Sequence, residues 1–126
     1  NVGKENYYVV GKEDLSDLEG NFLNNMKRIG LLDSVTLLNM PNDEAEKQLK
    51  ETRIRFLFID GDHTKEGVEK DIQLFFPRLI PGAIVVFDDF SGHFPGLIDA
   101  VDKLIAGRKF SRVMSYHNTL VLKIQE

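Results

Sequence analysis

Two apolar stretches that each end abruptly at aspartate constrain the fold of this chain more than any other feature. The first covers residues 56–59 and is followed by Asp60, and the second covers residues 83–87 and is followed by Asp88. Continuous apolar runs of this length are typical of parallel strands whose two faces are both covered. The sequence therefore predicts two buried strands with carboxylates at their ends.

The segment between these strands has the pattern of an amphipathic helix. Thr64 is a suitable N-cap, and Pro77 with Pro81-Gly82 marks the end of the helix. Between them, apolar residues recur at helical spacing: Val68, Ile72, Phe75 and Leu79. A strand, a helix and a strand form a right-handed crossover, so both aspartates are expected at the carboxyl edge of a parallel sheet, where ligands bind.

Further strands and helices are expected on both sides of this crossover. Strands are predicted at residues 7–10, 35–38, 112–116 and 120–124, the last two forming an antiparallel hairpin. Helices are predicted from a capping box at Ser16 up to Gly30, from a second capping box at Asp43 to about Thr52, and from Pro95 to just before Gly107. The sequence thus indicates an α/β layer protein.

Composition narrows the class of partner. The 126 residues suit one domain, covering 1–126, and the net charge of −4 without a cluster of Lys or Arg argues against a nucleic-acid surface. The absence of cysteine excludes disulfides and thiolate zinc sites. No apolar run is long enough for a membrane span, and the first residues lack a signal-peptide pattern. We expect a cytoplasmic protein with a small-molecule substrate.

The carboxylates at the strand ends are candidate metal ligands. Neighbouring strands lie roughly 4.8 Å apart, so Asp60, Asp88 and Asp89 can converge, and hard cations such as Mg²⁺ or Ca²⁺ take oxygen ligands. Because successive strand residues face opposite ways, Asp88 and Asp89 share an ion only if the chain turns there, and Ser91-Gly92 is suited to such a turn. The alternative is that these acids cap the next helix or are solvated in a loop.

Several motifs together resemble a known family. They are residues 58–63 (Phe-Ile-Asp-Gly-Asp-His), 66–68, 70–71, and 79–83 leading to Phe87-Asp88-Asp89. They resemble the second half of a class I S-adenosylmethionine-dependent methyltransferase, most closely small O-methyltransferase-like proteins of the "IDGDH" type, and residues 22–31 with 35–37 also fit. The resemblance implies a Rossmann-like methyltransferase sheet, mostly parallel with a C-terminal antiparallel hairpin and helices on both faces.

The resemblance also implies roles for individual residues. Asp60, Asp88 and Asp89 would bind Mg²⁺ or another divalent cation that holds the acceptor oxygen, and His63 would be the general base. Asp60 and the neighbouring Gly61 and Asp62 would contact S-adenosylmethionine. The implied activity is methyl transfer to an oxygen of a small molecule. For His63, a structural role at the helix entrance, bonded to a neighbouring carboxylate, remains the alternative.

The cofactor half of the family pattern is not visible in this sequence. The family has a glycine-rich turn after its first strand and an acid at the end of the next strand, whereas here the candidate strand at 7–10 is followed by Gly11-Lys12. After residues 35–38, Met40-Pro41-Asn42 stands where relatives often carry an acid. We therefore expect a domain that lacks the N-terminal strand and helix of the family, with either a homodimer or a missing N-terminal segment of a longer chain completing it.

Two other functions fit part of the sequence. A non-catalytic methyltransferase-like binding or assembly module would retain the fold without the glycine-rich turn and the acid that bind the cofactor. A haloacid dehalogenase-like phosphatase would match Asp60-Gly61-Asp62-His63-Thr64 as an Asp-x-Asp-x-Thr motif, with Asp88-Asp89 as its magnesium acids. The short spacing between these two motifs argues against the phosphatase.

Overall fold

The structure is a computed structural model that describes residues 17–107 and 110–125. The chain forms two units, one extending to Met40 and the other beginning at Pro41. The strand expected at residues 7–10 lies outside the described residues, and the single domain expected from length stays a prediction. Among the helices that are described, none has the length and apolar character needed to cross a membrane.

The first unit contains the predicted N-terminal helix, α2 (Leu18–Arg28), followed by the short 3₁₀ helix η2 (Leu32–Ser34). The helix ends in a Schellman motif, because Gly30 has a positive φ of 77° and the Leu31 N–H donates to the Met26 carbonyl at 2.9 Å. Its N-cap is Asp17, without a side-chain hydrogen bond, and Ser16, the cap residue of the predicted capping box, lies outside the described residues. The predicted end at Gly30 is therefore confirmed.

The predicted strand at residues 35–38 is wrong. Val35 has extended dihedral angles (φ −122°, ψ 134°), but residues 35–39 belong to no strand of the described structure. An extended segment becomes a strand only when a neighbour accepts and donates its backbone hydrogen bonds. The apolar pattern of this stretch indicated the local conformation and not the pairing.

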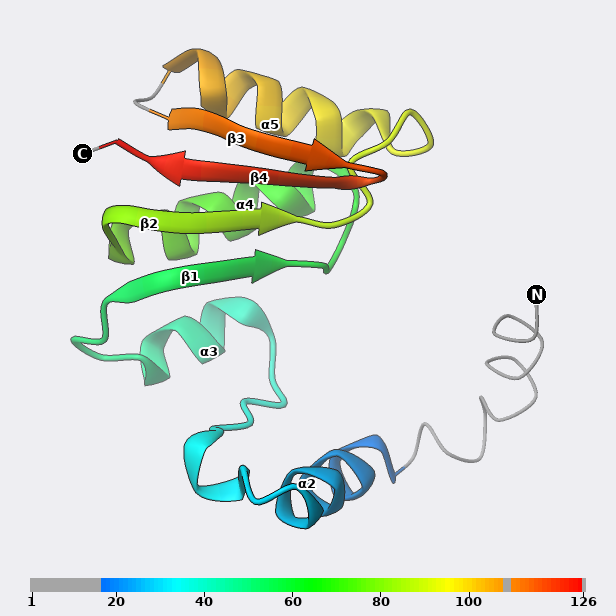
Figure 1. Cartoon of the computed structure of the whole chain (residues 1–126), viewed down its shortest axis with the longest axis vertical. Coiled ribbons are helices and arrows are strands. Elements are labelled where there is room, and N and C mark those ends of the chain that lie inside the picture. The colour runs from blue at the N-terminus through cyan, green and yellow to red at the C-terminus, as the bar shows by residue number, and fades with distance from the viewer. Residues whose placement is uncertain (1–16, 108–109, 126) are drawn as a thin grey trace. The chain divides into compact units, whose positions relative to one another are not determined.

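The second unit is built on one four-stranded sheet (Figure 1). Its strands are β1 (Ile54–Ile59), β2 (Leu79–Phe87), β3 (Phe110–Tyr116) and β4 (Thr119–Ile124), in the spatial order β1-β2-β4-β3. β1 and β2 are parallel and are joined through α4 (Lys65–Phe75), as predicted. β4 runs antiparallel to both β2 and β3, and a two-residue turn at His117 and Asn118 closes the predicted hairpin.

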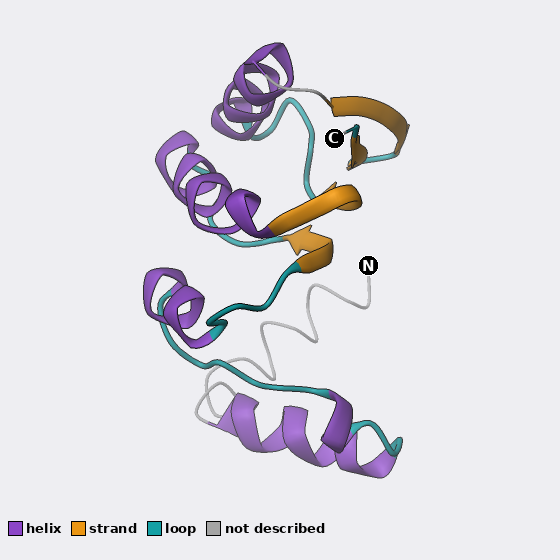
Figure 2. Cartoon of the chain, turned by 90° about the vertical axis from the view of Figure 1, so that its left-hand side faces the viewer, coloured by secondary structure: helices purple, strands orange, loops and turns teal. Residues whose placement is uncertain are grey.

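The described helices of this unit lie on one side of the sheet. α4 and α5 (Pro95–Gly107) pack together against it, and α3 (Asn42–Gln48) lies beside α4 on the same side (Figure 2). The opposite face exposes four large apolar side chains: Phe56, Phe58, Met114 and Tyr116. A helix layer on that second face stays a prediction.

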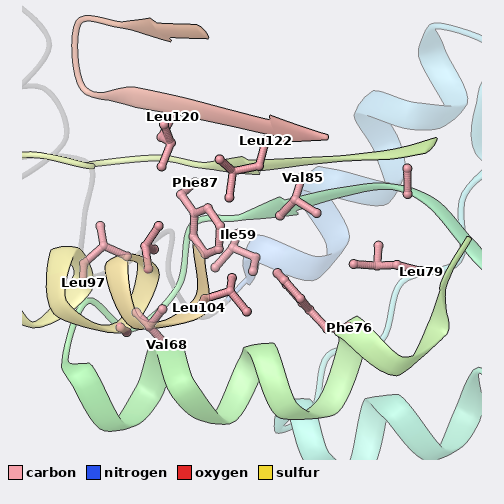
Figure 3. Packing of buried hydrophobic residues seen from close by; sticks show 13 residues of the cluster. Ile59, Val68, Phe76, Leu79, Val85, Phe87, Leu97, Leu104, Leu120 and Leu122 are labelled. Carbon is pink, nitrogen blue, oxygen red and sulfur yellow. The ribbon is translucent and has the colours of Figure 1, made fainter. Parts of the chain in front are cut away.

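The core lies between the sheet and the two long helices (Figure 3). Val85, Phe87, Leu120 and Leu122 come from the sheet, Val68 comes from α4 and Leu97 and Val101 come from α5, and each is at most 1% exposed. Full burial of such a side chain stabilises the fold by about 1.5–3 kcal/mol. This packing fixes the strand ends relative to the first turns of both helices.

Two element boundaries differ from the prediction. β2 begins earlier than predicted, at Leu79, because Leu79 pairs with Ile54 of β1. The next pair is Phe56 with Ile84, so the register shifts between the two pairs. Pro81 and Gly82 (φ 79°) lie in this irregular part of the strand. A 3₁₀ turn, η3 (Phe76–Arg78), separates α4 from this strand.

The predicted capping box at Asp43 is also wrong. α3 ends at Gln48, and its N-cap is Pro41, without a side-chain cap hydrogen bond. Asp43 lies in the first turn and pairs with Lys70, whose Nζ is 3.5 Å from Asp43 Oδ2 and lowers the pKa of that carboxyl. The acid therefore stabilises contact with α4.

Candidate functional site

The two parallel strands end at the same level. Asp60 follows β1 directly, and the Asp88 N–H, one residue beyond β2, donates to the Ile59 carbonyl at 3.1 Å. This bond extends the hydrogen-bonding ladder between the two parallel strands as far as Asp88. The carboxyl edge of the sheet thus presents the acidic residues together, as the crossover predicted.

The chain turns at Asp89 itself. Asp89 has a positive φ of 54°, and the next residue, Phe90, donates its N–H to the Asn118 carbonyl at 2.7 Å. Because of this turn, the carboxylates of Asp88 and Asp89 have different partners. Asp88 Oδ1 accepts from Thr119 Oγ1 at 3.4 Å, whereas Asp89 Oδ2 lies 3.2 Å from His63 Nε2.

Asp60, His63 and Asp89 form a compact cluster. One ligand atom of each residue lies within 4.8 Å of the other two, and His63 Nε2 is 3.9 Å from Asp60 Oδ1. The side chains of His63, Asp60 and Asp89 are 26%, 46% and 40% exposed, so the cluster is accessible from solvent. Asp88 does not belong to this set, and its predicted role as a ligand stays a prediction.

The donor atoms of the cluster fit a divalent cation. His63 Nε2 is buried and has no hydrogen-bond partner among the described residues, although a carboxylate oxygen is close. Two carboxylates and an imidazole supply the oxygen and nitrogen donors that divalent metals take, and one or two carboxylates suffice for Mg²⁺ when water or substrate completes the shell. Separations of 3.2 and 3.9 Å between donor atoms leave room for an ion bonded to each at about 2.0–2.6 Å.

The loop between Asp60 and α4 is shaped by Asp62 and Thr64. Asp62 Oδ1 accepts the Thr64 N–H at 2.8 Å, which is the main reason that the pKa of Asp62 lies below its ordinary value. Thr64 is the predicted N-cap of α4 and accepts the Gly67 N–H at 3.1 Å. A Cβ at Gly67 would lie 2.5 Å from Asp62 Cγ, so an alanine there would displace the Asp62 side chain. Asp62 therefore holds the loop, and its predicted contact with a cofactor stays a prediction.

Sequence reasoning missed two residues beside the cluster. The Phe94 ring lies against the His63 imidazole, with centroids 4.3 Å apart. Asp71, which is 7% exposed, accepts from Asn42 Nδ2 at 2.7 Å and lines a cavity of about 340 Å³ together with Asp60 and Gly61. Asp71 lies on the face of α4 that packs against the core. An acid at a position where the helical pattern expects an apolar residue is the sequence signal that could have identified it.

Comparisons with known proteins agree with this architecture. The O-methyltransferase from Bacillus cereus, solved in complex with S-adenosylhomocysteine (SAH), matches with a TM-score of 0.63 and 15% identity over 82% of this chain and 56% of its own. The TDP-rhamnose 3′-O-methyltransferase of calicheamicin biosynthesis matches with a TM-score of 0.52 and 20% identity over 65% of this chain and 37% of its own. At these identities the likeness shows the fold, which is the Rossmann-like sheet of methyltransferases.

The sequence comparisons identify the family. An uncharacterized protein of Acanthamoeba polyphaga mimivirus is 34% identical over 65 residues, covering 50% of this chain and 29% of that protein. The chain thus spans from under a third to little more than half the length of these relatives. A family model described as a methyltransferase domain matches residues 4–90, which is more than half of the chain. The chain therefore belongs to the methyltransferase domain family.

Proposed function

We propose that this protein takes part in S-adenosylmethionine-dependent methyl transfer to an oxygen of a small molecule, with the assistance of a divalent cation. The observation that carries the proposal is the cluster of Asp60, His63 and Asp89 at the carboxyl edge of the sheet. The two O-methyltransferases of like fold support the reaction, one by its complex with S-adenosylhomocysteine and the other by its sugar-nucleotide acceptor.

In this proposal Asp60 and Asp89 hold the cation, which is Mg²⁺ or another divalent ion. The cation, when bound, supplies Lewis-acid polarisation that makes an acceptor hydroxyl easier to deprotonate. The side chains of both acids are partly exposed, so an acceptor molecule reaches them from solvent. Asp88 is held by Thr119 next to this pair and is proposed as a further ligand.

His63 is proposed to accept the proton of the acceptor hydroxyl at Nε2. This atom has no hydrogen-bond partner among the described residues, and the hydroxyl of a bound acceptor would supply one. The competing role for Nε2 is that of a third metal ligand.

The methyl donor is proposed to be S-adenosylmethionine, held partly by Asp60, Gly61 and Asp62 as the family resemblance implies. The sequence contains no two glycines separated by a single residue, so the Gly-x-Gly pattern of the family's cofactor turn does not occur in it. The proposal therefore includes a second copy of the chain or a further N-terminal segment that completes the cofactor site.

Methyl transfer by the 126-residue chain tests the proposal. The chain is incubated with excess S-adenosylmethionine and with catechol, flavonoid and sugar-nucleotide acceptors, and methylated products are detected by mass spectrometry. We expect an O-methylated product that disappears with EDTA and returns with Mg²⁺. His63→Ala is expected to lower kcat by about 10²–10⁴-fold. His93→Ala, which alters an exposed loop histidine, is the matched control and leaves kcat unchanged.

Two results would contradict the proposal in different ways. If methyl transfer were unaffected by EDTA and by His63→Ala, neither a divalent cation nor His63 would take part in the reaction. Failure to methylate any of the acceptors at S-adenosylmethionine concentrations that saturate the chain would favour the alternative, a non-catalytic methyltransferase-like module for binding or assembly.

A further inference from the structure

The His63 imidazole is held from two sides by one short loop. Asp89, near the start of this loop, places Oδ2 3.2 Å from His63 Nε2. Phe94, just before α5, places its ring 4.3 Å from the imidazole at an interplanar angle of 35°. The loop between β2 and α5 therefore supplies both a carboxylate to the edge of the imidazole and an aromatic ring to its face.

Phe94 is anchored independently of His63. Its N–H donates to the Ser91 carbonyl at 2.9 Å, and its own carbonyl accepts the Ile98 N–H at 3.2 Å, which starts the hydrogen bonding of α5. Its side chain also packs against the buried hydrophobic cluster. A ring fixed by its backbone and by the core restricts the orientations of the imidazole in contact with it, because aromatic pairs favour particular geometries.

A second contact fixes α5 relative to the loop that carries His63. A Cβ added at Gly96, in the first turn of α5, would lie 2.7 Å from the backbone nitrogen of Lys65, the first residue of α4. The two helices therefore approach each other through their backbones two residues away from both Phe94 and His63. This leaves little freedom for the stacked pair to separate.

We propose that Phe94 is a positioning residue that holds the His63 imidazole with Nε2 directed at the carboxylates of Asp60 and Asp89. The inference rests on the proposed function, because it assigns Phe94 the task of keeping His63 beside the cation. Without the stack, the imidazole gains rotamers that move Nε2 away from the carboxylates. A displacement of about 1 Å is enough to impair a site of this kind.

Paramagnetic NMR with Mn²⁺ tests the inference without an acceptor or an activity assay. The chain has three histidines, so the ring protons of His63 are readily assigned, and Mn²⁺ broadens nearby protons with a steep dependence on distance. With Mn²⁺ at a small fraction of the protein concentration, we expect the broadening of the His63 ring to fall about threefold in Phe94→Leu, because broadening falls with the sixth power of distance and the ring moves roughly 1 Å. Broadening of the Asp60 and Asp89 amides is expected to stay unchanged.

Two variants serve as comparisons. Phe94→Tyr keeps the ring and is expected to restore the His63 broadening to the wild-type level. Phe110→Leu removes another aromatic ring that packs against the same core. The Phe110 ring contacts Phe76 and not His63, so this variant measures the effect of weaker core packing alone. It is expected to leave the broadening of His63 unchanged.

The outcomes separate this inference from the proposed function. If Mn²⁺ broadens the cluster equally in the wild type and in Phe94→Leu, Phe94 does not position His63, while the cation site stands. If Mn²⁺ broadens none of these residues in the wild type, the cation site fails and the inference fails with it. Equal losses in Phe94→Leu and Phe110→Leu would assign the effect to core packing and would also overturn it.

Discussion

The geometry of the site depends on single residues whose backbone or hydrogen bonding departs from the regular strand. Asp89 has a positive φ of 54°, which separates its carboxylate from that of Asp88. Asparagine and aspartate tolerate this conformation better than most residues. Asp89→Asn is therefore the appropriate variant for removing the charge without adding backbone strain.

Asp62 should make the stability of the chain depend on pH in the acidic range. Its pKa is lowered mainly by the hydrogen bond from the Thr64 N–H, and the carboxylate therefore contributes stability above its ordinary pKa of 3.8. That contribution is lost as the pH falls below 3.8 and through the lower pKa of the folded chain. Asp62→Asn should thus be less stable than the wild type near neutral pH, and the two should converge in acid.

Urea unfolding at a series of pH values measures this difference. Asp102→Asn, which removes an exposed acid of α5, is the control and should follow the wild type. If the difference in free energy of unfolding between the wild type and Asp62→Asn stayed constant down to the lowest pH, the charge of Asp62 would not be what stabilises the loop.

Much of the site could be predicted from single residues, and the remainder depended on contacts distant in sequence. The apolar runs ending at Asp60 and Asp88 predicted the shared edge, and the Thr64 cap is confirmed. A turn near Asp88 and Asp89 was expected from the following Ser91-Gly92, and the structure has it at Asp89, where the Phe90 N–H bonds to the β3–β4 turn. The sequence does not reveal that bond, nor the contact of Phe94 with His63.

At the scale of secondary-structure elements, the close approach of α4 and α5 should make Gly96 sensitive to substitution. Gly96→Ala places a methyl group 2.7 Å from the Lys65 backbone nitrogen, so the helices must separate. Overpacking of this kind costs about 1–3 kcal/mol in free energy of unfolding. Chemical denaturation of the variant and the wild type measures the cost.

Gly92→Ala is the matched control for Gly96→Ala. A Cβ at Gly92 meets no atom within 4 Å, so its effect should be within about 0.5 kcal/mol of zero. If both variants were equally stable, the helices would have to separate at no cost, and the close backbone contact would not constrain the site.

Helices and strands could be predicted correctly where the sequence pattern of a segment agreed with the strand pairing that the fold provides. The crossover from β1 through α4 to β2 and the β3–β4 hairpin are confirmed, because periodicity, caps and turn residues all indicated the same structure. The stretch at 35–38 failed because extended residues need a partner that pattern does not provide. α3 was misplaced at its start because Asp43 pairs with Lys70 of α4, a contact between elements.

At the scale of the whole molecule, the missing glycine pattern predicts weak cofactor binding by this chain alone. Each charge-assisted contact that is lost weakens binding by about 1.5–3 kcal/mol, so losing two or three from a micromolar site gives a dissociation constant of roughly 0.1 mM or weaker. Calorimetric titration with S-adenosylhomocysteine, with and without Mg²⁺, measures it. Micromolar affinity would show that these residues already form a complete cofactor site.

Binding of Mn²⁺, followed by electron paramagnetic resonance, tests the central claim that the acidic edge of the sheet is a divalent-cation site. We expect the wild-type chain to bind one Mn²⁺ that Mg²⁺ displaces, and Asp60→Asn and Asp89→Asn each to weaken binding by about tenfold or more. Asp99→Asn, at an exposed position of α5, should bind as the wild type does. Wild-type affinity in both Asp60→Asn and Asp89→Asn, or no bound Mn²⁺ in the wild type, would contradict the claim.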